Sequence, residues 1–488
     1  MRVLLVFLFA QSIALAEDRP NILMIAVDDL RLMLGCYGDD RVLTPNIDKL
    51  AKRSVLFERA YCQYAKCGTS RLSLMTGLRP DSIGVFSNNE RDVRAFRERR
   101  RDAKSMARWF KDHGYHSQSF GKIYHDGWDN PDDWSVPSSP GRDREMWEIM
   151  DHDNPTGPTI IAERWACPVI QSPNVADDHL FAGRMTNDVV ETLQQLPEDA
   201  PFFLAVGYRR PHLPFVAPKR YFDLYEPDKS WLTTQPNPPE KSPLYAWFNS
   251  DGYGGGAKRV GLTMPNPPSR EEAIDWNGYE MRSYLDVAYQ GEIPEQRQID
   301  LVHAYAACVS YVDAQIGRLL EAVGDDTTIV LWSDHGWHLG EMCAWGKMTN
   351  YEIATRVPLL IAQPGHGGSR TRALAELVDL YPTLCDVAGL DQPSHLEGES
   401  LAPILADPSL DGGVALSQYE RYNGKMHGRA LRTDRYRYVA WFDPSGKVIG
   451  RELYDHSKDP DETRNIEGKV DVDLIDELHR QLFTEFGL

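Results

Sequence analysis

The sequence predicts an α/β fold in which helices flank a large, mostly parallel sheet, followed by a small antiparallel subdomain. Residues 22–27 form a continuous apolar run, typical of a strand that is covered on both faces. Along the first 390 residues such runs alternate with helical patterns, as in layered α/β proteins. Several of the runs end in polar or charged residues. Because open α/β sheets bind ligands beyond the carboxyl ends of their strands, we expect these residues to converge.

The elements of the main domain, residues 17–390, are predicted in chain order. The predicted strands are residues 22–27, 117–120, 202–206, 328–332 and 357–361. The predicted helices are residues 67–76, 104–113 and 303–323, the first two of which end at Gly77 and Gly114.

Past about residue 390 the pattern changes, and residues 391–488 are predicted to form a small second domain. Three short runs with turns between them indicate antiparallel strands: residues 429–433, 436–441 and 452–454. Residues 472–486 then predict a closing helix.

The N-terminus and the overall charge narrow the classes of function. Residues 1–16 have the pattern of a signal peptide, with Arg2, an apolar stretch and an Ala14-Leu15-Ala16 cleavage site. That stretch is too short to span a membrane, and no second one follows, so we expect a secreted or periplasmic protein without a membrane span. The net charge of −19 argues against nucleic-acid binding.

The seven cysteines show no CxxC zinc pattern. Cys308 lies on an apolar stripe of helical period and is expected in the core. Disulfides are permitted in an exported protein, but the sequence does not pair the cysteines.

Two long stretches, residues 126–180 and 218–300, lack a regular period. Long loops of this kind are either binding loops or surface elaboration, and both readings stay open. They carry aromatic side chains that could stack on sugar rings or pack the loops onto the domain: Trp134, Trp147, Trp231, Trp247, Phe248, Tyr253, Trp276 and Tyr284.

Three carboxylates follow two buried strands: Asp28 and Asp29 after the first, and Asp334 after residues 328–332. Grouped without cations they would repel one another, and a hard divalent cation resolves this. Oxygen ligands favour calcium or magnesium over zinc. His335, next along the chain, is either a further ligand of the cation or a residue that contacts the ligands without binding the cation.

Cys67 stands at the predicted start of a helix, among small and hydroxyl residues. The unpaired N–H groups and the positive dipole end at such a place stabilise an anion or an activated nucleophile. The alternative is a buried cysteine near a helix cap.

The stretch Cys67-Gly68-Thr69-Ser70-Arg71, closed by Thr76-Gly77, resembles the signature Cys-x-Pro-Ser-Arg of the type I sulfatases. The resemblance implies an alkaline-phosphatase-like sulfatase fold. It also implies that a maturation enzyme oxidises Cys67 to formylglycine, the catalytic residue. Thr69 departs from the signature, since the family usually has proline there, and proline would pre-set the first helical turn.

Further stretches resemble the iduronate-2-sulfatases within this family, over most of the mature chain. They include residues 21–30, 121–125, 207–215, 310–318, 333–341 and 345–347. The resemblance implies that calcium is held by Asp28, Asp29, Cys67, Asp334 and His335. It implies a sulfate site formed by Lys122, His125, His212 and Lys347, with Arg71 beside the nucleophile.

The leading hypothesis is therefore an exported, calcium-dependent sulfatase that acts on a sulfated sugar, with a 2-O-sulfated uronate at a chain end as the expected substrate. Arg209 and Arg210 are candidates for holding the uronate carboxylate. One alternative is a phosphate or phosphonate ester hydrolase of the same superfamily, since a fold does not fix a function. Another is a homologue without catalysis that binds sulfated glycans.

Overall fold

The computed structural model describes residues 19–137, 160–161, 164–196, 200–250, 269–422 and 424–488. The expected signal peptide, Trp147 and Tyr253 lie outside these ranges. Among the described residues, no helix has both the length and the apolar content that crossing a membrane requires.

An eight-stranded mixed sheet forms the centre of the molecule, in the order β12-β2-β13-β9-β1-β7-β3, with β14 paired to β2. Its strands are β1 (Asn21–Val27), β2 (Val55–Tyr61), β3 (His116–Gly121), β7 (Phe202–Tyr208), β9 (Thr327–Ser333), β12 (Arg356–Val357), β13 (Leu359–Ala362) and β14 (Ser369–Glu376). β1 runs parallel to both β7 and β9, and β3 runs parallel to β7. The predicted mostly parallel sheet is confirmed.

The sheet differs from the prediction at one side. The run 357–361 is divided at Pro358 into β12 and β13, and both pair antiparallel with β2. Proline has no N–H to give to a ladder, which explains the break. β2 and β14 were not predicted because charged residues interrupt their apolar patterns, for example Glu58 and Arg59 in β2.

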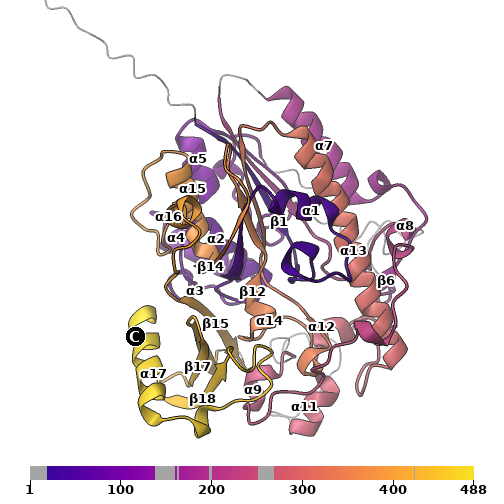
Figure 1. Cartoon of the computed structure of the whole chain (residues 1–488), viewed down its shortest axis with the longest axis vertical. Coiled ribbons are helices and arrows are strands. Elements are labelled where there is room, and N and C mark those ends of the chain that lie inside the picture. Colours follow the sequence, from indigo (N-terminus) through magenta and orange to yellow (C-terminus); the bar gives the residue numbers. More distant parts are fainter. Residues whose placement is uncertain (1–18, 138–159, 162–163, 197–199, 251–268, 423) are drawn as a thin grey trace, which may run out of the picture.

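Alternate residues of β1 face two helical layers. Ile22, Met24 and Ala26 pack in the core shared with α2 (Cys67–Thr76), α5 (Met106–Asp112) and α15 (Leu380–Val387). Leu23, Ile25 and Val27 pack in the core shared with α1 (Pro45–Ala51), α7 (Phe181–Gln195) and α13 (Glu295–Ala322). Figure 1 shows the two layers on either side of the sheet. Burial on both faces explains why β1 is an uninterrupted apolar run.

Two helices differ in their limits from the prediction. α5 begins at Met106, because the Ser105 hydroxyl accepts a hydrogen bond from the Arg108 amide and caps the helix. α13 begins at Glu295, directly after Pro294, and its polar first turn carries no apolar stripe. Cys308 is fully buried on this helix, as expected. All seven cysteines are free thiols.

Shorter elements lie between these layers and around them. The helices are α3 (Pro80–Ile83), α4 (Glu90–Arg99), α8 (Lys219–Phe222), α9 (Leu244–Trp247), α11 (Arg270–Trp276), α12 (Tyr279–Arg282), α14 (Glu352–Thr355) and α16 (Ala402–Ala406). The strands are β4 (Ile160–Ile161), β5 (Arg164–Trp165), β6 (Ile170–Gln171), β8 (Phe215–Val216), β10 (His338–Leu339) and β11 (Trp345–Gly346).

A four-stranded antiparallel sheet lies at one end of the molecule (Figure 1). Its strands, in spatial and chain order, are β15 (Ala415–Arg421), β16 (Met426–Arg432), β17 (Tyr436–Phe442) and β18 (Val448–Asp455). Helix α17 (Val472–Phe486) packs Ile475, Leu478 and Leu482 against this sheet. The predicted antiparallel C-terminal sheet is confirmed, whereas the boundary near residue 390 stays a prediction.

Candidate active site

The carboxyl ends of β1 and β9 bring the predicted acidic residues together. The two strands are neighbours in parallel register, with Val27 opposite Ser333. Asp28 and Asp29 therefore emerge beside Asp334, and the Asp29 amide donates a hydrogen bond of 3.2 Å to Asp334 Oδ1. All three side chains are fully buried.

The backbone at Asp29 adopts a left-handed conformation, with φ 62°. This conformation is uncommon for a residue with a side chain, so surrounding contacts must hold it. The Tyr305 hydroxyl donates to the Asp29 carbonyl at 2.8 Å and accepts from the Arg31 amide at 2.9 Å. The turn that aims the two carboxylates is thus fixed from α13.

Cys67 is the first residue of α2, a helix whose ten residues are all buried. The helix ends at Gly77, with φ 67°, as predicted from the sequence. Cys67 Sγ lies 3.3 Å from His335 Nε2 and 3.3 Å from Lys347 Nζ. Burial and the nearby Asp28 raise the pKa of the Cys67 thiol to about 11, against the opposing effect of Lys122 and Lys347. The thiol is therefore protonated at neutral pH and is a weak nucleophile.

Arg71 lies one turn further along α2 and ties the acidic residues to the helix. Its Nε donates to Asp334 Oδ2 at 2.8 Å, and its Nη2 donates to Asp28 Oδ1 at 3.0 Å. Its Nη1 donates to the backbone carbonyls of Lys122 and Ile123. These bonds use four of the five N–H donors of a guanidinium group, so Arg71 has a single donor left for a ligand.

Lys122 and His125 follow β3. Lys122 Nζ donates to Asp28 Oδ2. Burial alone would raise the pKa of Asp28, but the charges of Lys122 and Arg71 outweigh it and hold this pKa well below its usual range. Burial and the charge of Lys122 lower the pKa of His125 to about 3. His125 Nδ1 is buried without a hydrogen-bond partner among the described residues, and the ring meets Trp128 edge-on.

His212 lies in the turn after β7. Its Nδ1 donates to the Leu213 carbonyl at 2.7 Å, which leaves the Nε2 lone pair directed toward the cluster. Nε2 is 4.0 Å from Asp29 Oδ2. Burial, Lys347 and Lys122 hold the pKa of His212 well below its usual value, so the ring is neutral.

Lys347 follows β11 and completes the cluster. Its Nζ donates to Asp29 Oδ1 at 2.8 Å and lies 5.0 Å from the centre of the Trp337 ring. The structure thus brings together every residue of the predicted site: Asp28, Asp29, Cys67, Arg71, Lys122, His125, His212, Asp334, His335 and Lys347.

The donor set fits a hard divalent cation. Ligand atoms of Asp28, Cys67, Asp334 and His335 lie within 4.8 Å of one another. Asp29 Oδ2 is buried and has no hydrogen-bond partner among the described residues. Burial raises the pKa of Asp29 well above its usual value, despite Lys347, so a cation at this place would restore the carboxylate. His335 Nδ1 bonds the Gly336 carbonyl at 3.0 Å, which frees Nε2 to act as a ligand.

A second group of metal-ligand types, Glu352, His456 and Glu462, does not fit a metal. Arg437 donates from Nε to Glu462 at 2.6 Å and from Nη2 to Glu352. Arg437 and Arg432, which lies 3.3 Å from Glu352, already neutralise these carboxylates, and the group is an ion-pair network that joins the C-terminal sheet to α14.

Glu280, on α12, is a member of the cluster that the sequence analysis missed. Its Oε1 lies 3.5 Å from Lys347 Nζ and 3.6 Å from His212 Nε2. It stands within the long stretch 218–300 and follows no strand, so no local pattern pointed to it.

The structure bears on two interpretations that the sequence left open, a carboxylate site at Arg209 and Arg210 and sugar stacking by the aromatic residues of the loops. Arg209 and Arg210 are 2% and 3% exposed, Arg209 bonds Asp126, and Arg210 bonds the His212 carbonyl, which argues against a role in holding a substrate carboxylate. Four of the aromatic residues proposed to stack on sugar are buried in cores and offer no free face: Trp134, Trp247, Phe248 and Tyr284. Trp231 and Trp276 are partly buried against the same cores.

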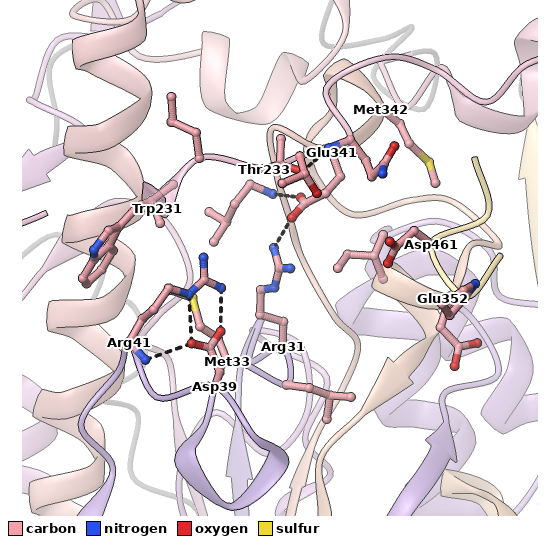
Figure 2. A pocket seen from close by; sticks show the side chains of 18 of the residues that line it. Arg31, Met33, Asp39, Arg41, Trp231, Thr233, Glu341, Met342, Glu352 and Asp461 are labelled. Carbon is pink, nitrogen blue, oxygen red and sulfur yellow. Dashed lines mark hydrogen bonds and ion pairs between the residues drawn. The ribbon is translucent and has the colours of Figure 1, made fainter. Parts of the chain in front are cut away.

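A cavity of about 440 Å³ lies elsewhere and contains none of the cluster residues (Figure 2). Two ion pairs lie within its wall. Arg31 bonds Glu341 at 2.9 Å, and Arg41 bonds Asp39 at 2.6 Å. Both arginines of these pairs are therefore already engaged by carboxylates of the wall.

Comparison with known proteins decides the family. The sequence profile of the family described as Sulfatase matches residues 20–390, and the profile described as N-sulphoglucosamine sulphohydrolase, C-terminal, matches residues 340–486. The chain belongs to the sulfatase family. It is a sulfuric ester hydrolase of the type I class.

Individual relatives agree with this assignment. The sulfatase is 33% identical to iduronate 2-sulfatase of Mus musculus and 32% identical to that of Homo sapiens, in each case over 92% of this chain and 91% of the relative.

Solved structures share the fold. One is described as a complex with its substrate D-glucosamine-2-N,6-O-disulfate, with a TM-score of 0.70 and 21% identity, covering 96% of this chain and 98% of that one. A phosphonate monoester hydrolase of Agrobacterium radiobacter has a TM-score of 0.70 and 23% identity, and the match covers 96% of each chain.

Proposed function

We propose that this sulfatase hydrolyses sulfate esters of sugars, and that its substrate is a 2-O-sulfated uronate at a chain end. The observation that carries the proposal is the arrangement around Cys67, in which a helix N-terminus, three carboxylates and three buried cations meet. The similarity to iduronate 2-sulfatases over 92% of the chain supports the choice of sugar.

The charge of the cluster supports binding of a sulfate ester. With Asp29 ionised, as it would be beside a bound cation, Asp28, Asp29 and Asp334 balance Arg71, Lys122 and Lys347. A bound divalent cation would leave the cluster positive, which favours an anionic ester in a site shielded from water. We assign the cation as calcium, held by Asp28, Asp29, Asp334, His335 and residue 67, where it would polarise a sulfate oxygen and offset the charge that repels a nucleophile.

Residue 67 is proposed to act as formylglycine, produced from Cys67 by a maturation enzyme. Its hydrated aldehyde would supply a hydroxyl nucleophile and a second hydroxyl that releases the sulfate. The unmodified thiol is protonated and has no second hydroxyl. Thr69 stands where the family has proline, yet the position is helical, and the Thr69 hydroxyl donates to the Val85 carbonyl at 2.8 Å.

The remaining residues are assigned to binding and proton transfer. Lys122 and Lys347 hold the sulfate oxygens as point charges, and the remaining Arg71 donor orients residue 67. His125 is assigned to the surroundings of the sulfate. Binding of the anionic ester favours the protonated form of His212, which places a proton on Nε2, and His212 or Lys347 then passes a proton to the leaving sugar oxygen.

The proposal includes export, with a secreted or periplasmic location and a role in degrading glycosaminoglycans or other sulfated polysaccharides. The proposal of export is supported by the signal-peptide pattern of residues 1–16.

The experiment is sulfate release by the mature protein, produced with a maturation enzyme and calcium. Aryl sulfate, aryl phosphate and a set of sulfated oligosaccharides are compared. Preference for aryl sulfate and for uronate 2-sulfates at chain ends is expected. Preference for the phosphate would favour the phosphate or phosphonate ester hydrolase, and binding of oligosaccharides without turnover would favour the inactive homologue. Preference for internal sulfates or amino-sugar 6-sulfates would contradict the proposed substrate.

A further inference from the structure

Glu280 stands at the open side of the cluster. The deeper side chains of Asp28, Asp29, Arg71 and Lys122 are at most 1% exposed, whereas those of Glu280 and His212 are 14% and 15% exposed. Because a sulfate ester must enter from the side that solvent reaches, the part of the substrate beyond the sulfate passes Glu280.

The position of Glu280 is fixed by close packing against β11, the strand that precedes Lys347. Gly278, with φ +79°, allows this approach, since a Cβ there would lie 2.9 Å from the Trp345 backbone nitrogen. The buried Asn249 accepts from the Gly278 amide at 2.9 Å and donates to the Lys347 carbonyl at 2.9 Å. One amide side chain thus joins α12 to the backbone of Lys347.

The Glu280 carboxylate keeps acceptor capacity. Oε1 lies 3.5 Å from Lys347 Nζ and 3.6 Å from His212 Nε2, and both distances are longer than an ordinary hydrogen bond. Oε2 is buried and has no hydrogen-bond partner among the described residues. A buried carboxylate oxygen without a donor is costly, so a ligand that brings a donor is favoured and a ligand that brings an anion is repelled.

The distances relate Glu280 to the reacting ester. Lys347 Nζ stands between the two groups, 3.5 Å from Glu280 Oε1 and 3.3 Å from Cys67 Sγ. An ester bound beside Lys347 and residue 67 would therefore bring the sugar substituents next to its sulfate toward Glu280.

We infer that Glu280 is a specificity-determining residue, which accepts a hydrogen bond from a hydroxyl on the carbon next to the sulfate-bearing carbon and excludes a second sulfate there. The inference rests on the proposed sulfatase function but not on the identity of the sugar. It assigns the enzyme to esters with a free hydroxyl beside the sulfate, which a 2-sulfated uronate with a free 3-hydroxyl satisfies.

The test uses two aryl esters that differ in one group, phenyl sulfate and 2-hydroxyphenyl sulfate, with sulfate release followed directly. For the wild type and Glu280→Gln, kcat/KM is measured on both esters, and the ratio of variant to wild type on each ester cancels differences in leaving-group chemistry. Loss of a hydrogen bond to a carboxylate predicts that Glu280→Gln lowers kcat/KM about tenfold or more on the hydroxyl-bearing ester and about threefold or less on phenyl sulfate. Glu271→Gln, an exposed change on α11, is the matched control and should leave both values unchanged.

An equal loss on both esters would overturn the inference, because it would show that Glu280 only positions Lys347. No loss on either ester would overturn it as well. Glu280→Asp, which retains the charge but shortens the side chain, should recover part of the preference, and thermal unfolding of each variant confirms that the fold is intact. A wild type that releases sulfate from neither ester would contradict the proposed function itself, and the inference with it.

Discussion

Lys347 Nζ lies 3.3 Å from Cys67 Sγ, although 280 residues separate them in the chain. The contact places a cation beside the residue on which the chemistry is proposed to occur. Cys67→Ala is therefore expected to leave the fold intact, since it removes a single buried atom, and to abolish sulfate release. Circular dichroism and turnover of aryl sulfate check the two parts. Activity at the wild-type level in this variant would rule out the assignment of Cys67.

Metal binding should show itself in thermal stability as well as in activity. A ligand at about 100 times its Kd adds about 2.7 kcal/mol to the stability of the folded state. Calcium is therefore expected to raise the Tm of the chelator-treated wild type. Asp29→Asn should lose most of that increase, because Asp29 Oδ2 has no other partner among the described residues.

Asp178→Asn provides the matched control, because Asp178 is exposed and distant from the cluster in sequence, and its calcium-dependent increase in Tm should equal that of the wild type. If a chelator changes neither the Tm nor the activity of the wild type, the result would contradict a calcium site.

Arg71→Lys tests whether the guanidinium group holds the acidic cluster together. Lysine cannot donate to Asp28, Asp334 and two carbonyls at once, so buried groups lose their partners. Breaking a buried ion-pair network costs about 3–5 kcal/mol, and we expect the variant to lose that much stability without calcium. Calcium should restore part of it by neutralising the same carboxylates. Denaturant unfolding with and without calcium measures both effects, and a variant as stable as the wild type in the chelated state would show that Arg71 has no such role.

A buried histidine outside the cluster predicts how stability depends on pH. His338 Nε2 is 3.0 Å from the Thr349 hydroxyl, and burial lowers the pKa of His338 to about 4. Below pH 6.5 the unfolded chain binds a proton there that the folded chain does not, so this stabilising contribution is complete above pH 6.5 and is lost as the pH falls toward 4. At 1.36 kcal/mol per pKa unit the loss reaches about 2 kcal/mol at pH 5.

His338→Gln keeps a side chain that bonds Thr349 and removes the titration. Its stability in calcium-free buffer should fall less than that of the wild type between pH 7 and pH 5. Parallel pH profiles for the two proteins would contradict the lowered pKa.

The strand ends were predictable because β1 and β9 are uninterrupted apolar runs that stop at Asp28 and at Ser333. The local pattern was sufficient there, because a strand that is buried on both faces is apolar at consecutive positions. The same reasoning failed for β2, where Glu58 and Arg59 interrupt the run and Arg59 finds its partners at the Arg372 carbonyl and Asp434, far along the chain.

Glu280 shows the limit of local pattern at the site. Its role depends on the docking of α12 beside Trp345 and on the bridge through Asn249, neither of which leaves a spacing in the sequence. The aromatic residues of the loops show a related limit. Their residue types suit both sugar stacking and packing, and only the tertiary structure shows that Trp134 and Trp247 are buried.

Thr69→Pro tests the one departure from the family signature. The residue lies in the first turn of α2, where amide groups have no partner within the helix, so proline is tolerated there. We expect the variant to fold, to lose about 1 kcal/mol with the Thr69–Val85 hydrogen bond, and to raise the converted fraction of Cys67 when a maturation enzyme is limiting. Mass spectrometry of the two proteins made side by side measures that fraction, and equal conversion would show that the proline is dispensable.

The mass of the peptide that carries residue 67, from protein made in its native host, tests the central claim most directly. The account predicts a peptide in which an aldehyde replaces the thiol, which reacts with a hydrazine, in a preparation that hydrolyses sulfate esters. An unmodified Cys67 in an active preparation would contradict the account.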